Sequence, residues 1–242
     1  MTILALEFSS PQRSVAVVCT GNTEVAAEIV ETGAGFRPSQ KNVGASSRQA
    51  GGTRALGMIE AVLREVGLER EQIDVIAVGL GPGSYTGIRA ALSIAQGWQL
   101  ARDVKLLGAS SAECLAAQAR SKKIFGRVNV VIDAQRNEFY RAAYEISQSA
   151  CREIEPLQIM GLAEIESRTN AGDILIGPEA TRWFPSGRII FPHARTLGRL
   201  VAGGNDFMSG DRLAPIYLRA ANFIKAPPVN PVAHKNIADC AI

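Results

Sequence analysis

Gly81-Pro82-Gly83-Ser84-Tyr85-Thr86-Gly87-Ile88-Arg89 is the most informative stretch of this 242-residue chain. It follows an apolar run at Ile73–Leu80 and precedes a long stretch with helical patterning. Glycine takes positive φ freely, and a proline restricts both itself and the residue before it, so this glycine loop predicts a sharp strand-to-helix turn. Ser84 or Thr86 is placed to cap the first turn of the helix.

Two explanations of the glycine loop remain open. Backbone N–H groups at the positive end of a helix attract anions, which makes the loop a candidate anion site. Its spacing matches neither the Walker pattern nor GxGxxG, so close packing of a tight connection accounts for the glycines at least as well. The anion site would consist of Gly81, Gly83, Ser84, Thr86, Gly87 and Arg89.

The composition is that of a globular protein, with 47% apolar residues and a net charge of +3. This charge is too small to imply nucleic-acid binding by itself. The four cysteines are scattered without a CxxC pair, which argues against a zinc site or a disulfide framework and fits a reducing compartment. Met1–Ser10 lacks the basic region of a signal peptide, and no apolar stretch approaches the length of a membrane span. We therefore expect a cytoplasmic protein without a membrane anchor.

The first third of the chain predicts a βββαβα unit. Short apolar strands come first, a helix with apolar residues at helical spacing follows, and a strand, the glycine loop and a second helix complete the unit. The predicted elements are strands at Thr2–Phe8, Ser14–Cys19 and Thr23–Glu31, a helix through Leu56, Ile59, Leu63 and Val66, a strand at Ile73–Gly79 and a helix at about Thr86–Ala101. The glycine-rich stretch Gly33–Gly52 predicts a mobile loop.

The same pattern recurs in the second half. Val130–Asp133 echoes Leu4–Glu7, since each apolar strand ends in a carboxylate, turns through polar residues and returns as a second strand. We therefore expect a duplicated α/β fold with two subdomains, residues 1–106 and 107–225. The proline-containing segment 226–242 has no periodicity and predicts a flexible tail.

Four segments, in the same order, resemble the bacterial TsaB (YeaZ) family of tRNA threonylcarbamoyladenosine synthesis. The glycine loop resembles its GPGSFTGxR signature, and the resemblance covers roughly residues 1–225. The other segments are Ile3–Val18, Val131–Tyr140 and Ala214–Arg219, which resemble the ILAIDTS…SVAL, IDARxxEVY and PxYLR patterns. Glu7-Phe8 stands where the family has Asp-Thr, and Gly51-Gly52 where it often has His-Ser or His-Thr.

This resemblance implies a duplicated βββαβα fold of the actin-like ATPase (ribonuclease H-like) superfamily. It also implies a non-catalytic subunit that binds and supports a TsaD-type catalytic subunit. That subunit transfers a threonylcarbamoyl group to N6 of the tRNA adenosine beside the anticodon. A TsaE-type ATPase would complete the assembly, and tRNA would be reached indirectly through the complex.

Glu7 and Asp133 are the candidate acids, expected at the ends of corresponding strands and facing a cleft between the halves. They would form a vestigial nucleotide site, or alternatively serve a small actin-like kinase or ATPase that acts alone. We expect no catalytic residue and no cofactor, with ATP or ADP bound only within a complex. The two histidines, His193 and His234, do not share a helix face, so no metal site is expected and a metallopeptidase is disfavoured.

The helix after the glycine loop carries one charge between Gly87 and Ala101, at Arg89. A helix that is apolar on two sides needs two covers, and its own sheet supplies one. Another segment of this chain, a TsaD-type partner or a second copy of the isolated chain could supply the other, and the resemblance favours the partner. The expected interface residues are Leu56, Ile59, Leu63, Ala90, Ile94, Gly97 and Ala101.

The densest basic cluster follows the expected first half and consists of Arg120, Lys122, Lys123 and Arg127. Cations at a helix C-terminus complement the helix dipole, which is the default explanation. A contact with tRNA phosphates is the weaker alternative, and its binding would fall steeply with salt.

Overall fold

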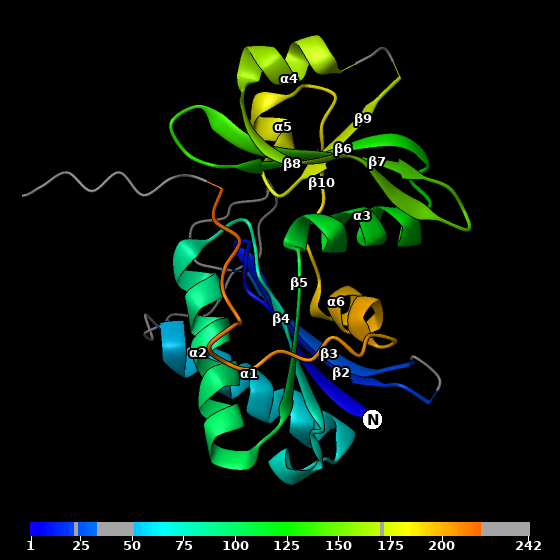
Figure 1. Cartoon of the computed structure of the whole chain (residues 1–242). Helices are drawn as coiled ribbons and strands as arrows, with labels where there is room; N and C mark the ends of the chain where they lie inside the picture. The colour runs from blue at the N-terminus through cyan, green and yellow to red at the C-terminus, as the bar shows by residue number, and fades with distance from the viewer. Residues whose placement is uncertain (22–23, 33–50, 170–171, 219–242) are drawn as a thin grey trace, which may run out of the picture.

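A computed structural model describes residues 1–21, 24–32, 51–169 and 172–218. Two five-stranded sheets dominate the described part, one in each half of the chain (Figure 1). The first has the order β3-β2-β1-β4-β5 and the second β10-β9-β6-β7-β8. The strands of the first sheet are β1 (Thr2–Glu7), β2 (Gln12–Cys19), β3 (Glu24–Thr32), β4 (Val75–Gly79) and β5 (Lys105–Ala109). Those of the second are β6 (Gly126–Asp133), β7 (Glu138–Ile146), β8 (Cys151–Gly161), β9 (Ile174–Gly177) and β10 (Arg188–Ile189).

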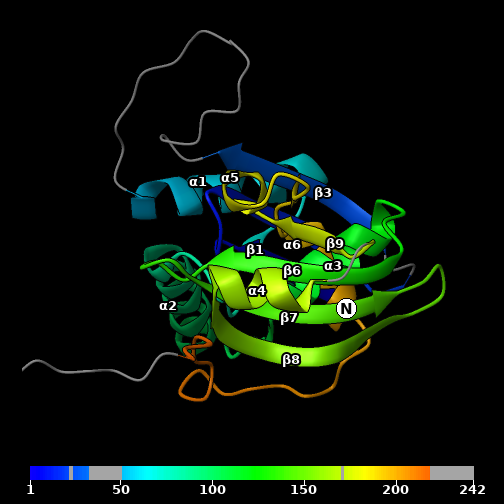
Figure 2. The same cartoon turned by 90° about the horizontal axis from the view of Figure 1, so that it is seen from above.

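Helices cover both faces of each sheet, as the side view and the view from above show (Figures 1 and 2). Within the first half they follow the predicted βββαβα order as far as α2. The helices are α1 (Gly51–Val66), α2 (Tyr85–Arg102), α3 (Ser111–Ser121), α4 (Leu162–Arg168), α5 (Ala180–Trp183) and α6 (Ala194–Val201), with a short 3-10 turn at Arg70–Gln72.

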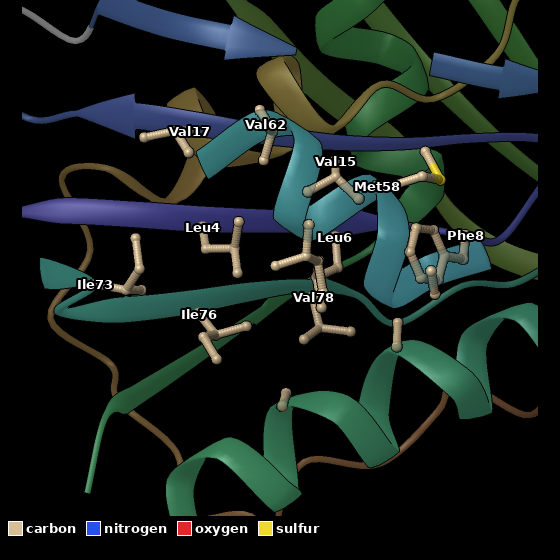
Figure 3. Close-up of a cluster of buried hydrophobic side chains, with 14 of the residues drawn as sticks. Leu4, Leu6, Phe8, Val15, Val17, Met58, Val62, Ile73, Ile76 and Val78 are labelled. Atoms are coloured by element: carbon tan, nitrogen blue, oxygen red, sulfur yellow. The ribbon is translucent and has the colours of Figure 1, made fainter. Parts of the chain in front are cut away.

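The first sheet is buried on both faces. Successive side chains of a strand point to opposite faces of the sheet, and in these strands both sets are apolar. Leu4 and Leu6 pair with Val17 and Val15 in antiparallel register and with Ile76 and Val78 in parallel register. These side chains pack under α1, where they meet Met58 and Val62 (Figure 3). The intervening residues Ile3, Ala5, Ala16 and Val18 form the opposite face.

The last helix of each half packs across the boundary between the halves. Helix α3 places Ala112, Leu115 and Ala119 against the second sheet, whereas α6 places Ala194 and Leu197 against the first. Each half therefore continues the predicted βββαβα unit with one more strand and one more helix. The expected duplicated α/β fold is confirmed. The expected boundary at residue 106 falls inside β5, and the first sheet continues to Ala109.

The segment after α6 returns along α2, where it is drawn in orange in Figure 1. The Met208 N–H donates to the Leu106 carbonyl at 2.9 Å, and the Ile216 N–H donates to the Leu80 carbonyl at 2.9 Å. Between them, Gly210 is held by hydrogen bonds with Gln96 and Gln99 of α2. The predicted loop at Gly33–Gly52 ends earlier than expected, because α1 begins at Gly51. Its residues 33–50 and the predicted tail at 226–242 lie outside the described residues.

Candidate functional site

The glycine loop rests directly on the end of β1. A Cβ atom on Gly83 would lie 2.1 Å from the Ser9 carbonyl oxygen, and one on Gly87 would lie 2.0 Å from the Phe8 carbonyl oxygen. Gly81 and Gly83 have φ of 86° and 147°, values that side chains disfavour. Close backbone packing therefore accounts for the glycines.

Several N–H groups of the loop already have partners within the chain. The Ser84 N–H donates to the Ser9 carbonyl at 2.6 Å, and the Gly81 N–H donates to Ser111 Oγ at 3.2 Å. The Ser84 side chain caps α2 by accepting from the Gly87 N–H at 3.3 Å. These three donors are not free to bind an anion, whereas Thr86 and Arg89 are exposed. The anion site stays a prediction that now depends on Arg89.

Glu7 is completely buried beneath the loop, at 0% exposure, so it does not face an open cleft as expected. One carboxylate oxygen accepts from the Ser9 N–H at 2.8 Å and the other from the Ser111 hydroxyl at 3.0 Å. Burial raises the pKa of Glu7, and the hydrogen bonds from Ser9 and Ser111 oppose that rise. Glu7 therefore joins the end of β1 to the start of α3 as a structural group.

Asp133 occupies a different environment at the end of β6. Its Oδ1 accepts from the Gln135 N–H at 2.7 Å, which closes the turn between β6 and β7. Glu179, at the N-terminus of α5, lies close by and was not among the predicted site residues. Burial, together with the charge of Asp133, raises the pKa of Glu179 to about 7. A carboxylate directly after the Gly177-Pro178 turn was the signal that could have identified it.

Helix α2 has three kinds of surface. Its core face, which includes Ile88, Ala91, Leu92 and Ala95, packs on the first sheet. A second flank is covered by this chain's own returning segment, since Gln96 Nε2 donates to the Gly210 carbonyl at 2.8 Å and the Gly210 N–H donates to Gln99 Oε1 at 2.7 Å. The alternative of an internal cover is thus correct for this flank.

The third surface of α2 is exposed, and we call it the exposed stripe. It consists of Ser93, Gly97, Leu100 and Ala101. Leu100 is 89% exposed, and a Cβ atom on Gly97 would meet no atom within 4 Å. Leu100 was not among the expected interface residues, although its place on an apolar helix was a signal for it.

The remaining expected interface residues divide between the surface and the core. Leu56 of α1 is 51% exposed, whereas Ile59 and Leu63 are 1% and 4% exposed. The assignment of Ile59 and Leu63 to a partner surface is therefore corrected, because both pack between α1 and the first sheet. Ala90 and Ile94 are half-buried at the border of the exposed stripe.

A tyrosine–arginine cluster lies at the N-terminal end of α2 and consists of Tyr85, Arg89 and Tyr217. The two tyrosine rings stack with centroids 5.8 Å apart, and the Arg89 guanidinium lies 5.1 Å from the Tyr85 ring centroid. Arg89 Nη1 also donates to the Tyr85 hydroxyl at 2.6 Å. The four-residue spacing of Tyr85 and Arg89 was a signal that could have identified their shared helix face, but no local signal placed Tyr217 beside them.

The four residues of the predicted basic cluster lie in two different environments. Arg120, Lys122 and Lys123 are exposed around the end of α3. Arg127 instead forms ion pairs with Glu155 and Asp173 on the second sheet. Arg127 is therefore not available to a phosphate in the way that the other three are.

No grouping of metal-ligating side chains occurs within residues 1–21, 24–32, 51–169 and 172–218. His193 lies at the N-terminus of α6, where its Nδ1 is 3.3 Å from a carboxylate oxygen of Glu28, and His234 lies outside the described part. None of the described helices has the length and apolar character needed to cross a membrane.

Comparisons with known proteins agree on one family. The family model for TsaD, tRNA N6-adenosine threonylcarbamoyltransferase, matches residues 42–234. The chain is 30% identical to the tRNA threonylcarbamoyladenosine biosynthesis protein TsaB of Haemophilus influenzae over 140 residues, which are 58% of this chain and 52% of that protein. It is 37% identical to TsaB of Escherichia coli over 92 residues, 38% of this chain and 40% of that protein. These matches span about half the length of the curated relatives or less.

The fold also has a close counterpart among solved structures. YeaZ from Pseudomonas aeruginosa superimposes with a TM-score of 0.71 at 23% sequence identity, over 90% of this chain and 99% of that chain. The likeness confirms the arrangement of the two sheets and their helices.

Proposed function

Because the chain belongs to the TsaD-related family, on its TsaB (YeaZ) branch, we propose that it is a non-catalytic subunit in tRNA threonylcarbamoyladenosine formation. Its role is to bind and support a TsaD-type catalytic subunit. A TsaE-type ATPase completes the assembly, and the chain binds ATP or ADP, if at all, only within that complex.

The observation that carries this proposal is the exposed stripe of α2. Isolated apolar residues are common on protein surfaces. Leu100, at 89% exposure, lies on the same helix face as Gly97, where a Cβ atom would meet open space, and this combination supports a docking role for the stripe. A glycine lets a neighbouring helix approach closely, and Leu100 adds the apolar area that association buries. The core face and the returning segment cover the other two surfaces of α2, so the stripe is the surface that remains for a partner.

The chemistry of the acids supports a non-catalytic role. Glu7 has no exposed surface, and both of its carboxylate oxygens already accept hydrogen bonds from the chain. A group in this position cannot hold a nucleotide without rearrangement of β1 and α3. The kinase or ATPase alternative, which needs Glu7 and Asp133 together, is therefore not favoured.

A reconstituted reaction tests the proposal. A TsaD-type subunit, a TsaE-type ATPase, threonylcarbamoyl-adenylate and unmodified tRNA are combined with and without this chain, and modified adenosine is measured. We expect modification that depends on the chain, and no ATP hydrolysis or chelator-sensitive peptide cleavage by the chain alone. Modification that proceeds equally without the chain contradicts the proposal. ATP hydrolysis by the purified chain that is lost in Asp133→Asn supports the kinase or ATPase alternative instead.

A further inference from the structure

The N-terminal end of α2 differs in chemistry from the exposed stripe. Tyr85 is 55% exposed and Tyr217 is 48% exposed, so about half of each tyrosine remains open although the two rings stack. Arg89 lies on the same face of α2 as Tyr85, and it precedes Leu100 by eleven residues. At a rise of 1.5 Å per residue this is a distance of roughly 16 Å along the helix. The two ends of α2 therefore present separate surfaces, one aromatic and cationic, the other apolar.

Arg89 is held in place by Tyr85. It donates to the Tyr85 hydroxyl, and its guanidinium lies 5.1 Å from the Tyr85 ring centroid. A guanidinium has five N–H donors, so these contacts fix its orientation and leave donors for a ligand. Within the described residues, no ion pair joins Arg89 to a carboxylate. Its positive charge is therefore available at a preorganised position.

The second half of the chain presents a further cation on the same side of the molecule as the start of α2, at the turn between β6 and β7 (Figures 1 and 2). Gln135, Arg136 and Asn137 in this turn are exposed and have φ of 66°, 62° and 59°. Three successive non-glycine residues with left-handed backbone conformation are rare. The Asp133 carboxylate helps to hold them, because it accepts a hydrogen bond from the Gln135 N–H. Arg136 is thereby presented as a second cation.

We propose that the tyrosine–arginine cluster binds single-stranded RNA, namely the loop nucleotides of the tRNA substrate. This inference rests on the proposed function, which supplies an RNA substrate. Aromatic side chains stack on unpaired bases, and arginine binds the adjacent phosphate. Tyr85 and Tyr217 offer two half-exposed rings at this one surface. A tRNA thus contacts this subunit directly rather than only through its partner.

The test measures the affinity of the full chain, alone and in complex with a TsaD-type subunit, for a labelled RNA hairpin that carries the anticodon loop. A blunt RNA duplex is the control ligand, because its bases are paired and cannot stack on side chains. Base–aromatic stacking contributes about 1–3 kcal/mol per base, so Tyr85→Ala with Tyr217→Ala weakens hairpin binding by about tenfold or more. The matched pair Tyr85→Phe with Tyr217→Phe keeps the rings and binds within about twofold of the wild type.

Two further variants make the result specific. Arg89→Gln removes one phosphate contact and lowers the salt dependence of binding by about one ion. Lys122→Ala with Lys123→Ala, at the end of α3, leaves hairpin binding by the cluster unchanged. Thermal melting of each variant verifies that it is folded. If the Ala pair unfolds, hairpin binding by the Phe pair and by Arg89→Gln still tests the proposal.

Three outcomes overturn the inference: hairpin and duplex bind equally, the Ala pair binds as the wild type does, or only the lysine pair weakens binding. Loss of affinity for the TsaD-type subunit with hairpin binding intact also overturns it, because the cluster is then a protein interface. The proposed function is judged separately by the modification assay. A chain that binds the hairpin but does not support modification contradicts the proposed function alone.

Discussion

Gly87 of α2 lies against Phe8 at the end of β1, so closely that a Cβ atom on Gly87 would be 2.0 Å from the Phe8 carbonyl oxygen. This contact sets the start of α2 on the first sheet. Because the opposing atom belongs to the backbone, it cannot move away as a flexible side chain could. The glycine loop is thus defined by packing against β1.

Gly87→Ala is therefore expected to destabilise the fold by about 1–3 kcal/mol, the usual cost of overpacking. The matched control is Gly97→Ala in the same helix, where the added methyl group meets open space. That change should stabilise the fold by up to about 1 kcal/mol, because alanine is the better helix former. Urea unfolding of both variants measures the difference. Equal effects of the two changes would show that the contact with Phe8 is not tight.

Glu179 is expected to make stability depend on pH. Burial, with the charge of Asp133, raises the pKa of Glu179 to about 7 from an ordinary value of 4.5. Between these values the folded state holds a proton that the unfolded state has lost, so stability decreases as the pH rises from about 4.5 to about 7. The loss is on the order of 3 kcal/mol. Glu179→Gln carries no such charge and should lose this dependence.

The measurement is the free energy of unfolding of the wild type and Glu179→Gln at about pH 4 and about pH 8. Relative to the wild type, Glu179→Gln should have a higher free energy of unfolding at the higher pH but not at the lower one. Comparison of the two proteins cancels the contributions of other titrating groups, including Glu7. A stability difference that is the same at both pH values contradicts the raised pKa.

Glu155 of β8 is the shared partner of three arginines, namely Arg127 of β6, Arg141 of β7 and Arg168 of α4. Arg141 is 1% exposed, so its charge depends on Glu155 and on Asn129 Oδ1, which accepts from Arg141 Nε at 3.0 Å. Glu155→Gln leaves this buried charge without its counter-ion and should cost about 1–3 kcal/mol.

Glu164→Gln is the matched control, because Glu164 pairs with the exposed Arg168 at the surface. An exposed pair contributes little, so this change should cost less than about 1 kcal/mol. Both variants are measured by urea unfolding near neutral pH. Similar losses for the two would mean that Arg141 does not depend on the Glu155 charge.

Gly97→Arg and Leu100→Arg are expected to weaken binding of a TsaD-type subunit while the isolated chain stays folded. Each places a long charged side chain on the exposed stripe, where it blocks close approach of a helix. Ala90→Arg, at the border of the stripe, should act in the same direction. Ile189→Arg is the control, since Ile189 is also an exposed apolar residue, at 46%, but lies on β10 of the second sheet.

Affinity for the TsaD-type subunit, measured by titration, decides this prediction. Ile189→Arg should bind as the wild type does, and the two stripe variants should bind at least about tenfold more weakly. Size-exclusion chromatography of the chain alone shows whether a second copy uses the same stripe. Unchanged affinity in the stripe variants would place the partner elsewhere.

Much of the fold could be read from local patterns. The alternation of apolar residues predicted four of the five strands of the first sheet, β1 to β4, and the carboxylate at the end of Val130–Asp133 revealed the duplication. β5 and α3 were not predicted, because Lys105–Ser121 lies where one repeat passes into the next. Their assignment needed the sheet itself, since a short apolar run does not identify its neighbours.

The candidate site was only partly predictable. Helical spacing indicated apolar faces on α1 and α2 but could not say which face would be covered. Ile59 and Leu63 proved to be core residues, and Leu100 proved to be 89% exposed. Glu7 was expected at an accessible cleft, yet the glycine loop and Ser111 enclose it completely.

The amino-acid sequence by itself determined the repeated order of strands and helices, the glycine loop and the family. These properties depend on neighbours within a few residues, so local periodicity and backbone preference suffice. The tertiary structure alone decided that Tyr217 stacks on Tyr85, that Gly210 covers one flank of α2 and that Glu7 is buried. Burial and stacking depend on segments more than a hundred residues apart, as Gln96 and Gly210 are, and only the packed chain brings them together.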